Sequence, residues 1–389
     1  MFLGVERWFV RTSFVFCRYQ AICSAGCKQV ESNKVRTKQE GDRIEKTRNN
    51  KANRQKLSFK TIFLQSVKCE FFLLVYKQVS LSLFKSINMN NKYNSPIRFN
   101  DSMHQEIKRI QSCMETQNDH LEIKTGYNAI DDCITGFRPG NVYLLASYPC
   151  CGKTAFLTNI SANIANTNNK VLFICPAMSN VQATQRFLAC ISGISLEEIA
   201  KGIMNDLLMQ NLMNQLLDAK EITDHLSIWD YPAIRIKDIK KYLFSLSEAD
   251  RPKILVIDDI NLIQNKSIDD SKKQPTNILQ KVRELAEMFA IPILVGTGLK
   301  RPKKKESHFP MLRDLQRNGI HEQFTDAVLF LYRPEYIELA NEEDTEFQAG
   351  ETHIRIAKNR HGVLETIKLK AEMTTQRFQS LDYDHEFNI

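Results

Sequence analysis

One eight-residue segment constrains the fold of this chain more than any other: Ser147-Tyr148-Pro149-Cys150-Cys151-Gly152-Lys153-Thr154. It lies between an apolar run at 142–146 and a helix-like run that begins at Ala155. Apart from Ser147, which stands at the first glycine, the segment fits the P-loop pattern G-x-x-x-x-G-K-[ST]. A P-loop cradles phosphates with backbone N–H groups and a helix N-terminus, because both attract anions. The sequence therefore predicts that all eight residues line a nucleotide, with Lys153 on the β and γ phosphates and Thr154 on Mg²⁺.

Apolar runs and helix-like stretches alternate along the rest of the chain. Strands are predicted at 171–175, 226–229, 254–257, 292–295, 328–332, 354–357 and 365–369. Helices are predicted at 154–165, 181–191, 236–247 and 278–289, with further helical residues up to about 220. The run 254–257 is apolar at every position, as in a strand that is buried on both faces of a parallel sheet. This alternation predicts an α/β fold with a mostly parallel sheet flanked by helices.

The N-terminal segment 1–88 differs in composition from the remainder. The chain has 389 residues and a net charge of +8. Residues 1–88 hold 17 Lys/Arg and 6 Asp/Glu, so this segment carries +11 and the rest of the chain carries −3. It has no proline, and no methionine follows Met1 before Met89. We interpret it as a basic irregular segment that is not part of the native product if translation begins at Met89 or Met103; a basic nucleic-acid-binding arm and a small irregular domain are the alternatives.

The next segment, 89–120, is predicted to be a linker with one amphipathic helix. Met103, Ile107, Ile110 and Met114 follow at i, i+4, i+7 and i+11, which places them on one helix face. Asp101 or Ser102 could cap this helix. Residues 121–389 are then expected to form the nucleotide-binding domain.

Cysteine spacing and charge distribution favour a soluble, cytoplasmic protein without a membrane partner. The ten cysteines show neither disulfide nor metal-ligand spacing, which is typical of reduced thiols. The apolar stretches of the first 27 residues and of 63–84 are interrupted by charged side chains, so neither fits a signal peptide or a membrane span.

Two further features accompany the P-loop. Asp258 directly follows the apolar run 254–257, where a carboxylate at the carboxyl edge of a parallel sheet can meet the Mg²⁺ of the P-loop. The segment 299–306 follows a strand that ends at the same edge and is strongly basic. It contributes the candidate phosphate-backbone contacts Lys300, Arg301, Lys303, Lys304 and Lys305, although a solvated surface loop has the same composition.

Several motifs occur together in an order that resembles the C-terminal motor domain of DnaB-type replicative helicases. They are Thr125-Gly126-Tyr127 with Asp131 and Gly136, Gly-Lys-Thr-Ala-Phe at 152–156, Ala177-Met178-Ser179, Ile257-Asp258 with Leu262-Ile263, Pro310-Met311 with Asp314-Leu315, Glu322-Gln323, and Ile356-Ala357-Lys358-Asn359-Arg360-His361-Gly362. The resemblance spans about 120–378. It implies a RecA-like P-loop NTPase fold, ATP and Mg²⁺ as cofactors, a ring of six subunits, and 5′ to 3′ movement on single-stranded DNA. The helix at 103–114 then resembles the family's linker helix, which docks on the neighbouring subunit.

The resemblance assigns roles to individual residues. Lys153 and Thr154 match the phosphate and metal residues, and Asp258 matches the carboxylate of the Mg²⁺ site. Lys358 and Arg360 match a lysine and an arginine finger that reach the ATP site of the next subunit, where they stabilise transition-state charge. Arg317 and Gly319 lie in the loop that contacts DNA in the family.

Several positions depart from the family pattern. Ala177 replaces the glutamate that orients or deprotonates the attacking water, and Gly298 replaces the glutamine that senses the γ-phosphate. Gln316-Arg317 replaces the usual Arg-Glu pair of the DNA loop. Asp259 stands where the family usually has an aromatic residue, and a carboxylate next to the Mg²⁺ ligand could serve as the missing base.

The sequence thus supports two hypotheses. The first is an ATP-hydrolysing DNA helicase of the DnaB type, in a homo-hexamer or in a mixed ring with another DnaB-type subunit, that acts on single-stranded DNA during replication. The second is an ATP-binding, DNA-associated DnaB-like paralogue with weak or absent hydrolysis, which Ala177 and Gly298 favour. Another RecA-fold ATPase, such as a recombination or clock-type protein, is the third alternative.

Overall fold

The computed structural model describes residues 96, 98–115, 122–264, 274–301, 309–336 and 349–381. All of these residues belong to the compact unit Asn88–Ile389. The predicted segment 1–88 and the lysines at 303–305 lie outside the described residues.

The described strands form one sheet of nine strands, in the order β3-β2-β4-β5-β1-β6-β7-β8-β9. The six strands from β3 to β6 in this order are parallel, and β7, β8 and β9 continue the sheet in antiparallel fashion. Their bounds are β1 Val142–Ser147, β2 Val171–Ile174, β3 Leu226–Trp229, β4 Ile254–Ile257, β5 Ile293–Gly298, β6 Ala327–Tyr332, β7 Glu351–Asn359, β8 Thr366–Glu372 and β9 Arg377–Ser380. The prediction of a mostly parallel α/β sheet is therefore confirmed.

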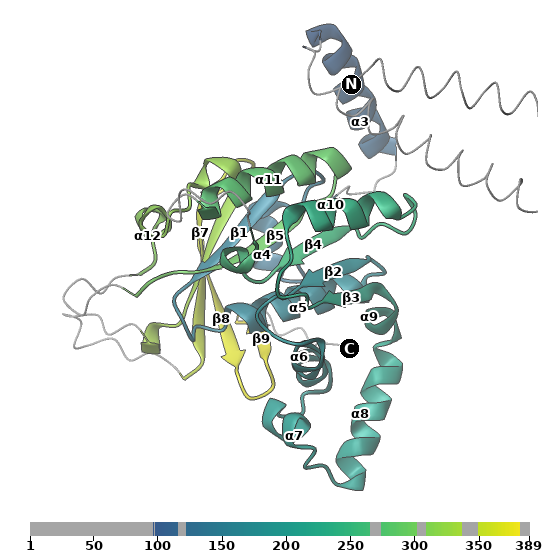
Figure 1. Cartoon of the computed structure of the whole chain (residues 1–389), viewed down its shortest axis with the longest axis vertical. Helices are drawn as coiled ribbons and strands as arrows, with labels where there is room; N and C mark the ends of the chain where they lie inside the picture. Colours follow the sequence, from purple (N-terminus) through teal and green to yellow (C-terminus); the bar gives the residue numbers. More distant parts are fainter. Residues whose placement is uncertain are drawn as a thin grey trace, which may run out of the picture. The chain divides into compact units, whose positions relative to one another are not determined.

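Helices cover both faces of the parallel part of the sheet (Figure 1). The described helices that follow residue 122 are α4 Asn128–Ile134, α5 Lys153–Asn166, α6 Asn180–Ser192, α7 Leu196–Lys201, α8 Asp206–Asp218, α9 Lys220–His225, α10 Ile236–Ser245, α11 Gln274–Phe289 and α12 Leu312–Arg317. Short 3₁₀ turns lie at η1 Ile260–Leu262, η3 Glu322–Phe324 and η4 Pro334–Tyr336.

The position of β1 between two layers of helices explains why its sequence is apolar at successive positions. Tyr143 and Leu145 point into the core formed with α4, α5 and α6, whereas Val142, Leu144 and Ala146 point into the core formed with α10 and α11. Successive side chains of a strand face opposite sides, so a strand between two helical layers buries all of them. The P-loop strand is thus fixed from both faces.

The amphipathic helix predicted around 103–114 is present as α3, Phe99–Glu115. Its apolar stripe is exposed, with exposed fractions of 36% for Met103, 43% for Ile107, 46% for Ile110 and 74% for Met114. No helix of the described residues is long and apolar enough to cross a membrane.

Candidate nucleotide-binding site

The P-loop connects the end of β1 to the beginning of α5. Gly152 is the N-cap of α5 and has φ +94°, a left-handed backbone conformation that residues with a Cβ rarely adopt. Cys150, also in the loop, has φ +69°. Ser147 remains within β1, where its carbonyl accepts the N–H of Leu299, so the absence of the first motif glycine does not disturb the strand. The loop thus leads directly into the N-terminus of α5, where anions are favoured.

Lys153, Thr154 and Asp258 form the centre of the site. The Lys153 ammonium contacts Asp258 Oδ1, and Thr154 Oγ1 donates to Asp258 Oδ2 at 2.5 Å. Asp258 follows β4 and is 3% exposed. The three residues follow two sheet strands, β1 and β4, that are separated by β5, and the parallel register brings their carboxyl ends to one edge. Lys153 and Asp258 are about a hundred residues apart in the sequence, so the prediction that they meet depended on the expected fold.

The donor set fits a magnesium ion with a bound phosphate. Mg²⁺ prefers hard oxygen ligands, and the Thr154 hydroxyl and the Asp258 carboxylate present such oxygens side by side. Burial by itself lowers the pKa of Lys153, but the facing carboxylates of Asp258 and Asp259 outweigh it, so the pKa lies above its ordinary value. Lys153 therefore stays a cation that can bind phosphate oxygens.

Asp259 contributes a second carboxylate to this cluster. Its Oδ2 lies 3.0 Å from Lys153 Nζ and accepts the backbone N–H of Gly298 at 2.8 Å. Its Oδ1 accepts the backbone and side-chain N–H groups of Asn261, both at 2.9 Å. The Asn261 amide also donates to Thr297 Oγ1 at 3.0 Å. Asp259 is thus fixed beside Lys153.

Ala177 lines a cavity of about 480 Å³ at the carboxyl ends of β2 and β3, together with Trp229 and Asp230. The methyl group of Ala177 offers no proton acceptor. The Asp230 carboxylate in the same cavity accepts the N–H of Asn180 at 2.7 Å and so caps the beginning of α6.

One residue at the site was missed by reasoning from the sequence. Arg186 of α6 hydrogen-bonds Gln376 at 2.5 Å. Burial lowers the pKa of Arg186, and the Asp258 carboxylate acts in the opposite direction. The signal in the sequence is that Arg186 is the one charged residue of α6, whose other residues are apolar or neutral.

Those predicted DNA contacts that the structure describes lie on loops next to the P-loop. Arg301 donates to the Pro149 carbonyl at 2.9 Å, and the N–H of Lys300 donates to Asn318 Oδ1 at 3.3 Å. Arg317, at the end of α12, lies 3.8 Å from Asp314 and is exposed, and Gly319 follows with φ +73°. Hydrogen bonds therefore connect the P-loop, the loop after β5 and the turn after α12.

Lys358 and Arg360 lie at the opposite edge of the sheet, where the parallel strands begin. Asn359 pairs with Ala327 at the beginning of β6, and Ala327 pairs with Tyr143 near the beginning of β1. The Lys358 ammonium donates to the carbonyls of Glu322 and Thr325 at 2.5 and 2.7 Å. Arg360 contacts Asp326 at 3.2 Å and the Gln323 carbonyl at 2.8 Å. Burial and the nearby Arg360 lower the pKa of Lys358. These two side chains do not reach the P-loop of their own subunit.

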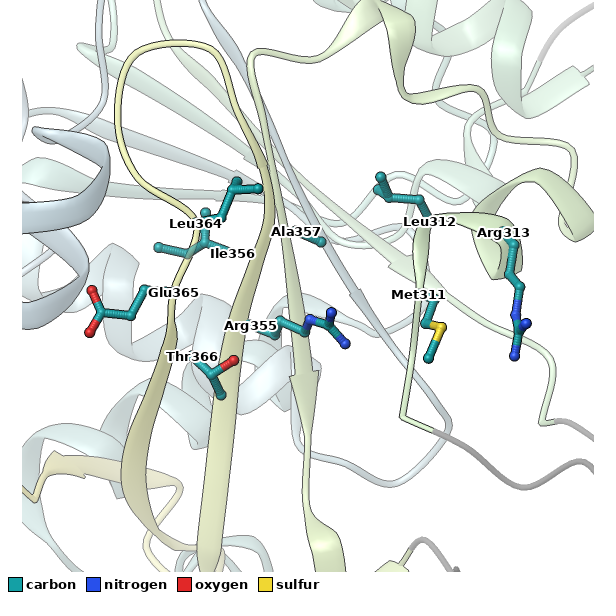
Figure 2. A pocket seen from close by; sticks show the side chains of 9 residues that line it. All are labelled: Met311, Leu312, Arg313, Arg355, Ile356, Ala357, Leu364, Glu365 and Thr366. Atoms are coloured by element: carbon teal, nitrogen blue, oxygen red, sulfur yellow. The ribbon is translucent and has the colours of Figure 1, made fainter.

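A cavity of about 570 Å³ lies beside the strand that carries Lys358 (Figure 2). Arg355, Ile356 and Ala357 of β7 form one wall, and the chain from Met311 to Arg313 at the start of α12 forms the other. Figure 2 shows Arg355 extending toward the side of Met311, whereas Glu365 points the other way. Glu365 there accepts the thiol of Cys133 at 3.3 Å. The cavity thus separates the strand with the proposed fingers from the helix of the proposed DNA loop.

Comparison with known proteins identifies the family. The model of the DnaB-like helicase C-terminal domain matches residues 122–380, which is most of the chain. The replicative DNA helicase DnaB of Geobacillus stearothermophilus is 27% identical over 289 residues, covering 72% of this chain and 62% of the relative. A probable replicative DNA helicase of Trieres chinensis is 29% identical over 263 residues, covering 66% of this chain and 56% of the relative. The chain therefore spans about three fifths of the length of these relatives.

Solved structures support the fold. One solved ATPase domain superposes with a TM-score of 0.64 at 21% identity, and the match covers 74% of this chain and 100% of that domain. A DnaB-like replicative helicase, described with its interactions with primase, gives a TM-score of 0.62 at 21% identity, with coverage of 79% and 77%. These likenesses confirm the RecA-like fold that the sequence predicted. Over residues 122–380, this chain belongs to the family of DnaB-like helicase C-terminal domains.

Proposed function

We propose that this protein is an ATP-hydrolysing DNA helicase of the DnaB type, which forms a ring and moves along single-stranded DNA during replication. Membership of the family supports this at the level of the domain. The observation that carries the proposal is the joint contact of Lys153 and Thr154 with Asp258 at the carboxyl edge of the sheet. This arrangement of lysine, hydroxyl and carboxylate suits a nucleoside triphosphate with its metal ion.

In this proposal, the residues Ser147 to Thr154 hold ATP, and Thr154 and Asp258 hold Mg²⁺. The bound ion would neutralise charge on the phosphates. Lys153 orients the β and γ phosphates through its ammonium group. Asp259 accepts the proton of the attacking water. Its carboxylate lies beside Lys153, which orients the γ phosphate, whereas Ala177 has no proton acceptor.

Lys358 and Arg360 act on the site of a neighbouring subunit. Their location at the edge of the sheet opposite to the P-loop supports this, because no single subunit can bring both sets of groups together. A ring of identical subunits, or one mixed with another DnaB-type subunit, supplies the missing half of each site. Residues 89–120 are the proposed linker, and the exposed apolar stripe of α3 is the face that docks on the neighbour.

DNA is proposed to lie along the loops that carry Lys300, Arg301, Arg317 and Gly319, together with the lysines at 303–305. Lys and Arg side chains bind the phosphate backbone without reading sequence, as a translocating helicase requires. The link from Arg301 to the Pro149 carbonyl supports a route by which DNA binding and nucleotide binding affect each other.

The second candidate is an ATP-binding paralogue that hydrolyses slowly or not at all. Two observations favour it: Ala177 lacks a carboxylate, and the side chain that would sense the γ-phosphate is absent at Gly298. In this case the ring binds nucleotide and DNA and assists another helicase subunit.

One experiment separates the two candidates. The steady-state ATPase rate of the full chain is measured with and without single-stranded DNA, alongside that of Lys153→Ala. A helicase shows turnover well above that of the variant and a further increase with DNA. Turnover equal to that of Lys153→Ala, with DNA retention that depends on nucleotide, supports the paralogue and contradicts the helicase.

A further inference from the structure

The Asp259 carboxylate is held in place by the hydrogen-bond donors around it. Four donors surround it: Lys153 Nζ at 3.0 Å, the Gly298 N–H at 2.8 Å, and the two N–H groups of Asn261 at 2.9 Å. Its side chain is 15% exposed. A carboxylate held by this many donors stays where it is when one of them moves away.

Gly298 lies directly beside this carboxylate. Its N–H donates to Asp259 Oδ2 at 2.8 Å, and a Cβ added at Gly298 would lie in van der Waals contact with the same oxygen, at 3.5 Å. Glycine at 298 and aspartate at 259, two of the departures from the family pattern, are therefore in direct contact. They replace a neutral side chain at the end of β5 with an anion next to the phosphate-binding lysine.

The charge balance at the site depends on what occupies it. Without nucleotide, the single ammonium of Lys153 faces the two carboxylates of Asp258 and Asp259. When Lys153 turns to the phosphates, Gly298 and Asn261 still hold Asp259 in place. A metal-free triphosphate then lies beside the fixed carboxylate of Asp259, and the ammonium of Lys153 is shared between this carboxylate and the phosphates. Two like charges at a few ångströms repel strongly where water is partly excluded.

We propose that Asp259 makes this P-loop selective for metal-complexed nucleotide, by repelling the terminal phosphate of ATP unless a divalent cation offsets the charge. The inference rests on the proposed nucleotide binding at Lys153 and Thr154, and it is independent of whether Asp259 also acts as a base. It concerns equilibrium binding and needs no turnover. ADP lacks the terminal phosphate and is discriminated less.

The test is a set of binding titrations on the full chain with a fluorescent or calorimetric readout. ATP is titrated in excess EDTA and in excess Mg²⁺, and ADP is titrated in excess EDTA, for the wild type and for Asp259→Asn. The variant removes the charge but keeps an oxygen that can accept the Gly298 N–H. We expect Asp259→Asn to tighten metal-free ATP binding by about tenfold and to change Mg-ATP binding by less than about twofold, with ADP in between.

A matched control removes a carboxylate from the same sheet edge. Asp230→Asn, at the end of β3, deletes a negative charge that caps α6 rather than facing Lys153, and its amide oxygen can still accept the N–H of Asn180. It should change metal-free and Mg-ATP binding by equal, small factors. The inference is overturned if Asp259→Asn shifts both ATP titrations by the same factor, or if Asp230→Asn reproduces its effect. A wild type that binds no Mg-ATP would instead contradict the proposed function itself, and with it this inference.

Discussion

At the scale of single residues, the site is built around one cation between two anions. Lys153 contacts both Asp258 and Asp259, and Thr154 shares Asp258 with it. The two carboxylates follow one another along the chain, yet their surroundings differ. Asp258 faces the P-loop hydroxyl, whereas Asp259 is fixed by Gly298 and Asn261. Adjacent acids can therefore take different roles, as in the proposal that Asp258 holds the metal ion and Asp259 lies beside the terminal phosphate.

The proposed role of Asp259 as the base predicts a change in rate. Asp259→Asn should lower the DNA-stimulated ATPase rate at saturating Mg-ATP by about a hundredfold, because an amide cannot take the proton of the attacking water. Steady-state phosphate release measures this, with Asp230→Asn as the control that keeps its rate. A rate for Asp259→Asn equal to that of the wild type contradicts the assignment of the base.

A glycine in the turn after Arg360 is predicted to be sterically required. A Cβ at Gly362 would lie 2.0 Å from the Cys133 carbonyl oxygen, a backbone atom that cannot step aside cheaply. Gly362→Ala should cost about 2–3 kcal/mol of unfolding free energy, measured by urea denaturation. Gly202→Ala is the control, because Gly202 has φ +67° but nothing lies within 4 Å of its added Cβ; it should cost about 1 kcal/mol. Equal losses for the two variants contradict the steric argument.

At the scale of elements, helix ends and strand ends carry the functional groups. α6 begins with a capping box in which Ser179 accepts the N–H of Gln182 at 3.3 Å and the Gln182 side chain accepts the N–H of Ser179 at 3.0 Å. This fixes the helix that presents Arg186. The buried Tyr148 of the P-loop hydrogen-bonds Asp314 of α12, and burial raises the pKa of this tyrosine above its ordinary value. The P-loop and the proposed DNA loop are therefore joined by a neutral phenol and a carboxylate.

The exposed stripe of α3 predicts a variant that fails to assemble. Ile107→Glu places a charge in the middle of the stripe, where docking on a neighbouring subunit would bury it without a partner. We expect the mass of the assembly in sedimentation velocity to fall, while the thermal unfolding of the motor domain stays unchanged. Lys108→Glu, also on the exposed surface of α3, is the control that should leave assembly intact. Identical masses for wild type and Ile107→Glu contradict the docking role.

At the scale of the whole molecule, the two halves of the proposed catalytic site lie at opposite edges of one sheet. The P-loop follows the carboxyl end of β1, and Lys358 and Arg360 lie beside the amino end of β6. Both side chains are held in this structure by backbone carbonyls in and next to η3 and by the Asp326 carboxylate. In a head-to-tail ring, one edge of each subunit meets the other edge of the next.

This arrangement predicts complementation between two inactive variants. Lys153→Ala removes the phosphate contact of a subunit, and Arg360→Ala removes the finger that it offers to its neighbour. Mixed in equal amounts before assembly, the two should regain about one quarter of the wild-type sites, because an intact P-loop and an intact finger meet by chance at that fraction of interfaces. ATPase activity of the mixture is compared with that of each variant alone. A mixture no more active than the two separate variants contradicts catalysis between subunits.

The sequence by itself determined the local parts of this protein. Leu226–Trp229 forms a strand as predicted, although Ser227 interrupts its apolar residues. The strand Ile254–Ile257 also occurs where it was predicted, because a continuous apolar run is set by neighbouring residues alone. The P-loop was recognisable for the same reason. Other boundaries were extended by partners: β5 runs to Gly298 rather than ending near 295, since β1 pairs with it as far as Ser147. β9, whose pattern is too short to detect, forms only because β8 offers it a partner edge.

Tertiary structure alone decided how distant residues meet. The contact of Asp259 with Lys153 and Gly298, the approach of Arg301 to Pro149, and the hydrogen bond of Arg186 to Gln376 all depend on strand order and on crossing connections. The antiparallel turn of β7 to β9 put Lys358 and Arg360 at the far edge. Local sequence sets backbone conformation, because its interactions lie within a few residues. Which carboxylate faces which lysine depends on packing between segments that the chain brings together only when folded.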